Sequence, residues 1–475
     1  MLYIVIMKKL VLLMLSLIFM PASLAFGANI VYPKTSNPTI TAPTTFFIGN
    51  ESPNKKLYIN GEQVKIHKSG GFLHPVDLNI GENVFTISNN KSTLTYKITR
   101  PEPKNHNTKF SPITYKSPVI YITNADLSPL RATPYSSGTN RLQSLQKDIP
   151  LKIVGEYADF YKVQLARDDY AWIGKSRVKK APLQYLQPAK LLAKTFEETS
   201  TEYIYTYKLD RKVPFTFNPI TIYETNKTLD FFNEKIKNYN LILYYVKDFP
   251  ENKFDIDIDV NTKPFGYSIA YSDNNELIIK IKKASQIDKN QPLKGLKIML
   301  DAGHGGYETG TVGCLGDKEK DINFAMALKL KEKLQKAGAI VIMTRVNDSA
   351  LGLTERVLSA QKNNVDIFLS IHNNALPDSA ARSERIGAST YYYNLHSHEL
   401  AEKIQERLVN ELKMNDDKVR RESFAVIRNT QTVAVLIEVG YLIKPEDNIK
   451  LIDSKFQHKA AQAILHGLEN YLNEL

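Results

Sequence analysis

The sequence predicts a multidomain protein in which several all-β units precede one α/β domain. Its 475 residues exceed what a single hydrophobic core usually holds. Up to about residue 290, short segments of alternating apolar residues are separated by turns rich in Gly and Asn, a pattern typical of antiparallel strands. From Lys294 onward, apolar strands alternate with amphipathic helices, which indicates a twisted sheet flanked by helices on both faces.

The first 28 residues are expected to form a secretory signal peptide. Lys8 and Lys9 precede the apolar run 10–20, and small residues follow it, in the order that secretory signals share. The run is short for a membrane span, so an uncleaved anchor is the weaker alternative. We therefore expect a protein exported to the periplasm or cell wall, with no transmembrane anchor once the signal is removed.

The overall charge favours polyanionic surroundings. Lys and Arg outnumber Asp and Glu by 62 to 50, which gives a net charge of +12. Nucleic acid and the anionic polymers of a bacterial envelope both fit such a charge. Because we expect export, we exclude nucleic acid as the natural partner and favour the envelope polymers.

The chain has one cysteine, Cys314, so it cannot form an intrachain disulfide. Its stability must therefore come from hydrophobic cores. A thiol nucleophile or a metal ligand is conceivable at this position, but we interpret Cys314 as a small apolar loop residue.

Residues 29–105 are expected to form a small β sandwich. Three segments with strand periodicity are separated by turn signals, and these segments are 45–49, 56–59 and 83–87. The stretch resembles bacterial Ig-like modules, in which a phrase such as the one at 57–61 is common.

Residues 116–182 are expected to form a second β unit. Apolar strands at 149–155 and 160–165 precede the triplet Ala171-Trp172-Ile173. This succession resembles bacterial SH3-like barrels, a family that often binds cell-wall peptide. Trp172 either fills the barrel or faces a ligand, and we favour the first.

Residues 185–283 are expected to form a third, β-rich unit with many aromatic residues. Strand signals lie at 203–207, 241–246 and 276–281. The aromatic rings could stack on sugars, but packing in a β core is the favoured interpretation. The unit resembles the β-rich targeting modules that precede envelope amidases.

Residues 294–475 are expected to form the α/β domain, because apolar runs of strand length alternate with segments of helical periodicity. The expected strands are 296–300, 339–343, 367–371, 390–393, 425–427 and 433–440. The expected helices are 321–330 with its end near Gly338, 353–363, 399–412 and 456–471.

Four side chains of metal-site chemistry stand at the ends of these elements. His304 follows the first strand in the Gly-rich tract 301–306, Glu319 opens the next helix, His372 closes a strand, and Glu438 lies in the last strand. Ligands gather beyond the carboxyl ends of strands in open α/β sheets. Two His and one Glu can hold zinc with a fourth position left for water, and the second Glu can serve as base.

Each of these residues taken alone also allows a structural role. Either histidine alone would be read as a loop or core residue, but the combination with two glutamates favours a metal site. A lone carboxylate such as Glu438 inside an apolar strand is costly without a function.

Further polar residues of the domain are candidates for weaker roles. Asn374 and Arg428 are candidate substrate contacts, although arginines here could equally form salt bridges, as could Arg345 and Arg356. His396 and His398 flank a helix start, which favours capping and surface exposure over metal binding.

Five motifs in order resemble the zinc-dependent N-acetylmuramoyl-L-alanine amidases of peptidoglycan turnover. The motifs lie at 300–306, 319–323, 344–348, 370–375 and 436–441, and the resemblance covers the last 180 or so residues. The resemblance implies that His304, Glu319 and His372 bind zinc and that Glu438 is the catalytic carboxylate. It also implies peptidoglycan as substrate, cut at the amide between the lactyl group of muramic acid and L-alanine.

Two departures from the family pattern are visible. The family usually has Ser-Asn before a Pro that follows this motif, whereas this chain has Leu442-Ile443-Lys444 before Pro445, so the local loop is expected to differ. The connection from His372 to Tyr391 is short, whereas activator-controlled relatives carry a helical insertion there, so we expect an open site unless the β units cover it. A wall-binding protein without activity and a zinc peptidase acting within the stem peptide are the competing hypotheses.

Overall fold

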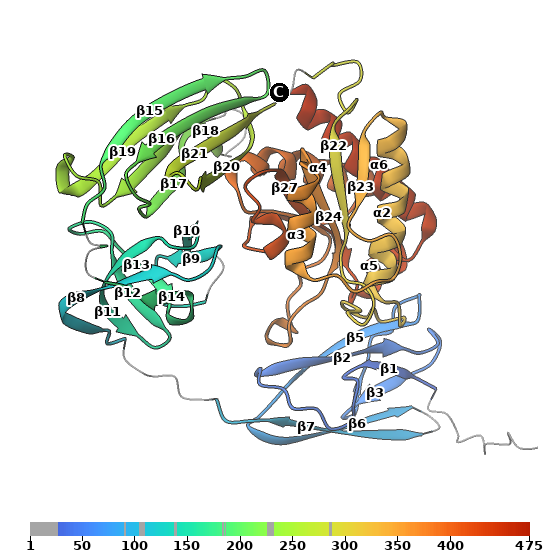
Figure 1. Cartoon of the computed structure of the whole chain (residues 1–475). Coiled ribbons are helices and arrows are strands. Elements are labelled where there is room, and N and C mark those ends of the chain that lie inside the picture. The colour runs from blue at the N-terminus through green and yellow to red at the C-terminus, as the bar shows by residue number, and fades with distance from the viewer. Residues whose placement is uncertain are drawn as a thin grey trace, which may run out of the picture.

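The computed structural model describes residues 27–475 except 90–91, 104–109, 137–139, 183–184, 186, 226–231 and 285–286. Three β-rich units and one α/β domain follow one another along the chain (Figure 1). Most of the expected signal peptide, residues 1–26, lies outside the described residues. No helix among the described residues is long and apolar enough to cross a membrane.

The first unit consists of two small sheets around one apolar core. Its buried residues include Phe47, Leu57, Phe72 and Ile87. One sheet has the order β1-β2-β5 and the other β4-β3-β6-β7. The bounds are β1 Asn29–Tyr32, β2 Thr44–Asn50, β3 Leu57–Ile59, β4 Glu62–Gln63, β5 Gly71–Asp77, β6 Gly81–Asn89 and β7 Thr93–Arg100.

The second unit is a single seven-stranded sheet in the order β10-β9-β13-β12-β11-β8-β14. Trp172 is 6% exposed, and its ring lies 6.2 Å from that of Phe110, so most of its surface is used in packing. The bounds are β8 Ile113–Thr123, β9 Ser128–Arg131, β10 Arg141–Leu145, β11 Pro150–Tyr157, β12 Phe160–Gln164, β13 Tyr170–Gly174 and β14 Val178–Lys180.

The third unit shares its core with the second. One continuous apolar cluster runs from Ile153 and Val163 to Tyr239 and Ile279. The sheets have the orders β15-β16-β21-β20 and β17-β18-β19. The bounds are β15 Leu191–Glu198, β16 Glu202–Leu209, β17 Phe215–Thr225, β18 Phe232–Tyr244, β19 Lys253–Asp259, β20 Pro264–Tyr271 and β21 Glu276–Lys283.

The α/β domain is built on a six-stranded sheet in the order β23-β22-β24-β27-β25-β26. The pairs β22–β23, β22–β24 and β24–β27 are parallel, and β25 runs antiparallel to β27. The strand bounds are β22 Lys297–Ala302, β23 Ile340–Met343, β24 Ile367–Asn374, β25 Ala388–Tyr392, β26 Asp416–Arg421 and β27 Val433–Tyr441.

Helices cover both faces of this sheet, as predicted. The helices α2, α4 and α6 pack on the face that carries Ile298 and Leu369, while α3 packs with Met299 and Phe368 on the other. The helix bounds are α2 Glu319–Lys336, α3 Leu353–Lys362, α4 His398–Leu412, α5 Pro445–Leu451 and α6 Ser454–Asn473.

One strand prediction in this domain was wrong. Residues 425–427 form the 3-10 turn η6, Ala425–Ile427, in place of a strand. Val426 and Ile427 are apolar because they pack with α3 on the sheet face. The sixth strand is β26, whose charged sequence DDKVRR gives little strand signal at the edge of the sheet.

Candidate metal centre

The parallel ladder brings the predicted site residues to one end of the sheet. Ala302 pairs with Ile371 between β22 and β24, and His372 pairs with Glu438 between β24 and β27. His304 follows β22 by two residues. The carboxyl ends of three neighbouring strands therefore carry the two imidazoles and one carboxylate, as expected for an open α/β sheet.

His304, Glu319 and His372 form a compact group. Their candidate ligand atoms all lie within 4.8 Å of one another. His304 Nε2 is 3.2 Å from Glu319 Oε2, and His372 Nδ1 is 2.9 Å from Glu319 Oε1. Two imidazole nitrogens and a carboxylate at this spacing are a donor set that fits a divalent metal ion.

The backbone around His304 has an uncommon conformation. His304 has φ 61°, and Gly305 and Gly306 that follow also have positive φ. A non-Gly residue in the left-handed region costs on the order of 1–3 kcal/mol, so its surroundings must hold it there. Arg345 donates to the carbonyl of Gly303, and Arg356 donates to that of His304 at 3.0 Å.

Glycine is required at two positions beside the candidate ligands. A Cβ on Gly303 would lie 2.2 Å from the ring of His372. A Cβ on Gly310 would lie 2.4 Å from Glu319 Oε2 and 2.7 Å from His304 Cδ2. The Gly-rich loop therefore lets the backbone approach these candidate ligands more closely than any other residue type permits.

The carboxylate of Glu319 is 4% exposed and held by several donors. The backbone N–H of Thr311 donates to Oε2 at 2.9 Å, and that of Asn373 donates to Oε1 at 3.2 Å. The amide of Asn323 also donates to Oε1. Burial alone would raise the pKa of Glu319, but the hydrogen bonds with the two imidazoles outweigh it and lower the pKa, so the carboxylate is ionised.

Glu438 differs from Glu319 in its environment. Its Oε2 is buried and accepts no hydrogen bond from the described residues. Burial, followed by the nearby charge of Glu319, raises the pKa of Glu438 well above its ordinary value. Two carboxylates with opposite pKa shifts are typical of a site in which one carboxylate stays ionised and the other takes up and releases a proton.

The structure does not bring both predicted substrate contacts to the metal group. Asn374 lies two residues after His372 at the end of β24, where its Oδ1 accepts from the N–H of Ala375. Arg428 precedes β27, at the end of this strand opposite to Glu438, and donates to the carbonyl of Ser423 at 2.6 Å.

Other residues singled out in the sequence have structural contacts. Arg345 and Arg356 are each 3% exposed, and Arg356 pairs with Asp301. Cys314 is buried, which raises the pKa of its thiol to about 12 and suits an apolar role. The expected surface exposure of His396 was wrong, since it is 8% exposed and its Nε2 lies 3.0 Å from the carbonyl of Thr432.

Sequence reasoning missed the residues that hold Glu319. Asn323 lies four positions after Glu319 on α2, a spacing that places two side chains on the same helix face, so this contact could have been found. Asn373 also donates to Asn323 Oδ1 at 2.8 Å. The backbone contact from Thr311 has no sequence signal, because any non-Pro residue carries that N–H group.

Comparison with known proteins assigns the last part of the chain to a family. The sequence pattern of the N-acetylmuramoyl-L-alanine amidases matches residues 298–470. YqiI of Bacillus subtilis, an uncharacterized protein, is 39% identical over 184 residues, which are 39% of this chain and 88% of YqiI. A probable cell wall amidase of Staphylococcus aureus, LytH, is 31% identical over 217 residues, 45% of this chain and 70% of LytH.

Other relatives are matched over different shares of their length. The N-acetylmuramoyl-L-alanine amidase LytC of Bacillus subtilis is 36% identical over 197 residues, 42% of this chain but only 39% of LytC. A solved amidase of Clostridium difficile 630 is 33% identical and is covered over 97% of its length, which is 38% of this chain, with a TM-score of 0.36. On the sequence matches to YqiI and LytH, this chain belongs to the N-acetylmuramoyl-L-alanine amidase family through residues 298–470.

Proposed function

We propose that the protein is an exported zinc amidase that hydrolyses the amide between the lactyl group of N-acetylmuramic acid and L-alanine in peptidoglycan. The observation that carries this proposal is the group His304, Glu319 and His372, whose ligand atoms lie within 4.8 Å of one another. Membership of the amidase family supports the substrate, and the cell wall names of relatives support export.

The proposed ligands and base follow from the contacts in the site. His304, Glu319 and His372 would hold the zinc ion, because imidazole and carboxylate are its common ligands. Zinc at this position would polarise the amide carbonyl and make a neighbouring water more acidic. The hydrogen bonds from Thr311 and Asn373 fix the ionised carboxylate of Glu319 for this role.

Glu438 is proposed as the general base. Its Oε2 accepts no hydrogen bond from the described residues, so it is available to take a proton from water. Burial raises its affinity for that proton, which it then donates to the leaving nitrogen. Asn374 is kept as a proposed substrate contact, while the position of Arg428 at the other end of β27 does not support contact with the scissile amide.

Product analysis tests this function against its alternatives. Purified protein loaded with zinc is incubated with peptidoglycan, and the products are identified by mass spectrometry. An amidase leaves glycan strands with a free lactyl carboxylate and releases peptides that begin with L-alanine. A zinc peptidase would leave L-alanine on the muramic acid, and a wall-binding protein without activity would release no product and hold no stoichiometric zinc.

The three β units are proposed to place the enzyme on the wall. We propose an Ig-like module at 29–105, an SH3-like module at 116–182 and an accessory β module at 185–283. The shared core of the second and third units supports their acting as one body. Full-length variants with substitutions on the surface of one β unit at a time would be tested for binding to purified peptidoglycan in pull-down experiments. The unit whose variants lose binding is the one that contacts the wall.

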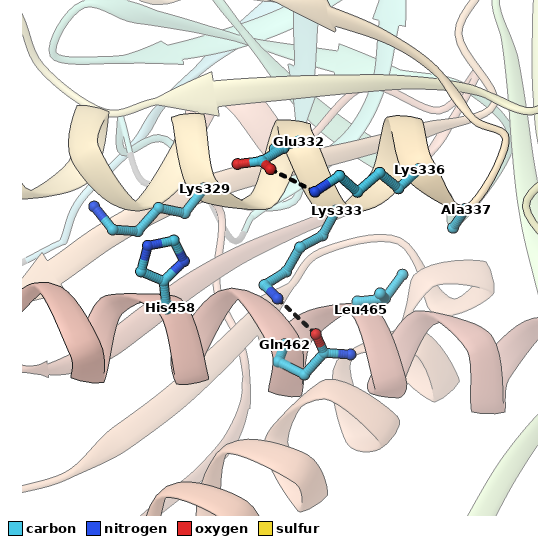
Figure 2. A pocket seen from close by; sticks show the side chains of 8 residues that line it. All are labelled: Lys329, Glu332, Lys333, Lys336, Ala337, His458, Gln462 and Leu465. Carbon is cyan, nitrogen blue, oxygen red and sulfur yellow. Dashed lines mark hydrogen bonds and ion pairs between the residues drawn. The ribbon is translucent and has the colours of Figure 1, made fainter.

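Anionic envelope polymers are proposed as a second partner. A hollow of about 540 Å³ lies between α2 and α6 (Figure 2). Lys329, Lys333 and Lys336 belong to its lining, and so does Glu332, which pairs with Lys336. Lys333 bridges the helices by donating to Gln462 at 2.6 Å. These lysines and the net charge of +12 favour a phosphate-bearing or carboxylate-bearing polymer on this face.

A further inference from the structure

The first β unit packs against the same end of the α/β sheet that carries the metal ligands (Figure 1). A separate apolar cluster joins the two parts. Phe46 and Ile48 of β2 contribute from the first unit, and the loops after β22, β24 and β27 contribute from the α/β domain. The buried residues of this cluster are Phe46, Ile48, Cys314, Leu376, Ala381, Tyr441 and Ile443.

Asp378 fixes the position of the first unit on the domain. The hydroxyls of Tyr32 and Thr45 donate to its carboxylate at 2.9 Å and 2.6 Å, and the hydroxyl of Thr44 donates to its carbonyl at 2.6 Å. Burial, together with the hydrogen bond to Asp378, raises the pKa of Tyr32 to about 12, so its hydroxyl remains a donor. The unit therefore presents a fixed wall to the loops around the site.

A pocket of about 260 Å³ lies at the edge of this interface. Phe46 and Ile48 of the first unit and Leu376 and Ile443 of the α/β domain belong to its lining. Lys34 is the only basic residue among the described residues that line the pocket. The pocket is thus largely apolar. Its lining carries the positive charge of Lys34 and the carboxylate of Asp378, which already accepts hydrogen bonds from Tyr32 and Thr45.

The pocket adjoins the metal ligands. Gly310 and Thr311 belong to its lining, and the N–H of Thr311 donates to Glu319 Oε2 at 2.9 Å. A Cβ on Gly310 would lie 2.4 Å from the same oxygen. The backbone of this loop therefore lies between the pocket and the side chains of His304 and Glu319, which places the pocket next to the proposed metal group.

The lining of the pocket favours the peptide part of a muramoyl peptide over its sugar part. Sugar hydroxyls need several hydrogen-bond partners when they leave water. This lining offers few, because most of its residues are apolar and Tyr32 and Asp378 are already paired with each other. A peptide with methyl side chains and a carboxylate meets both the apolar walls and the charge of Lys34. The volume is just below the usual range of about 300–1,000 Å³ for ligand sites, which suits a short peptide segment.

We propose that this pocket is the subsite for the stem peptide, with its wall formed by Phe46 and Ile48 and a peptide carboxylate paired with Lys34. This inference rests on the proposed amidase function and assigns a substrate-binding role to a unit outside the family domain. It makes the first β unit part of the active site in addition to any role in targeting.

Binding measurements on full-length, zinc-loaded protein test the subsite. The probes are N-acetylmuramoyl-L-alanine and N-acetylmuramoyl-tetrapeptide, and the Glu438→Gln background prevents turnover during calorimetry. We expect the tetrapeptide probe to bind more tightly than the short probe. Lys34→Glu should lower the affinity for the tetrapeptide probe about tenfold and leave the affinity for the short probe unchanged. Lys56→Glu is the matched control, since Lys56 is an exposed lysine of the same unit outside the pocket.

Phe46→Ala provides an independent test of the apolar wall. This substitution should lower the affinity for the tetrapeptide probe and not the affinity for the short probe. Circular dichroism checks that the variant remains folded. Equal affinity of both probes, or equal losses in Lys34→Glu and Lys56→Glu, would overturn the subsite. A protein that binds both probes normally but releases no L-alanine-led peptide from peptidoglycan would instead overturn the proposed amidase function.

Discussion

His372 and Glu438 are direct partners in the parallel ladder between β24 and β27. The same backbone hydrogen bonds therefore set the position of a proposed metal ligand and of the proposed base. Glu319 reaches this pair from the start of α2 through its contact with His372 Nδ1 at 2.9 Å. Sites held on strands and helix ends are more rigid than sites on loops, which suits a reaction that depends on fixed geometry.

The first prediction concerns the proposed base. Glu438→Gln keeps the shape of the side chain but removes its ability to take a proton. We expect the rate of amide cleavage to fall by about 10²–10⁴-fold. Zinc content measured by mass spectrometry should stay at the wild-type level, because Glu438 is not one of the three grouped ligands. Near-normal turnover in this variant would remove Glu438 from the proposed role.

The second prediction uses two glycines of the same loop. Gly310 and Gly316 both have positive φ, at 65° and 94°, so Ala strains the backbone at either position. Only at Gly310 would the new Cβ meet a proposed ligand, 2.4 Å from Glu319 Oε2, whereas nothing lies within 4 Å at Gly316. Gly310→Ala should therefore weaken zinc binding by about 10–100-fold, a loss typical of disturbed ligand positioning.

Chelator competition measures this difference. The zinc affinity of Gly316→Ala should stay close to that of the wild type, which separates the effect of the Cβ from that of backbone strain. Equal affinities in the two variants would show that the contact between Gly310 and Glu319 does not govern metal binding.

The proximity of the four site residues could be predicted from the sequence, and the reason is physical. His304, His372 and Glu438 each follow or end a strongly apolar run, and the carboxyl ends of parallel strands meet at one edge of the sheet. The turn at Ala425–Ile427 could not be told from a strand, since three apolar residues pack equally well in either form. Arg428 is predicted as a substrate contact from its charge alone. Charge carries no information about which end of β27 a residue lies at.

The contact between the first β unit and the α/β domain lay beyond sequence reasoning. Tyr32 and Asp378 are 346 positions apart, and neither belongs to a motif. Long-range pairs of this kind are fixed by how folded units dock, and local periodicity carries no information about docking. The position of the subsite beside Glu319 therefore became visible only in the structure.

The third prediction tests that docking. Asp378→Ala removes the acceptor for both Tyr32 and Thr45, which leaves two partly buried hydroxyls without a partner. The loss should cost about 1–3 kcal/mol of interface stability. Hydrogen exchange in β2, Thr44–Asn50, should speed up, whereas exchange in α6 should not change. The exposed neighbour Ser379→Ala serves as control, and unchanged exchange in both variants would mean that Asp378 does not hold the unit.

The fourth prediction concerns pH and the buried His396. Burial lowers the pKa of His396 from 6.5 to about 4, and the backbone hydrogen-bond partner Thr432 only partly offsets this. Above pH 6.5 the imidazole is neutral in the folded and unfolded chain, so its contribution to stability is complete. Between pH 6.5 and 4 the unfolded chain binds a proton that the folded chain does not, and stability falls. The full loss is about 3 kcal/mol, since each pKa unit corresponds to about 1.36 kcal/mol.

Urea unfolding followed by helical circular dichroism measures this loss. The described α-helices lie in the α/β domain, so the helical signal reports on the part of the protein that contains His396. The urea midpoint should fall between pH 7.5 and pH 5 in the wild type and fall less in His396→Gln, whose side chain does not take up a proton in this range. His458→Gln, at an exposed residue of α6 in the hollow that faces α2, is the control and should keep the wild-type slope. If His396→Gln loses stability with falling pH as steeply as the wild type does, another group must be responsible for the dependence.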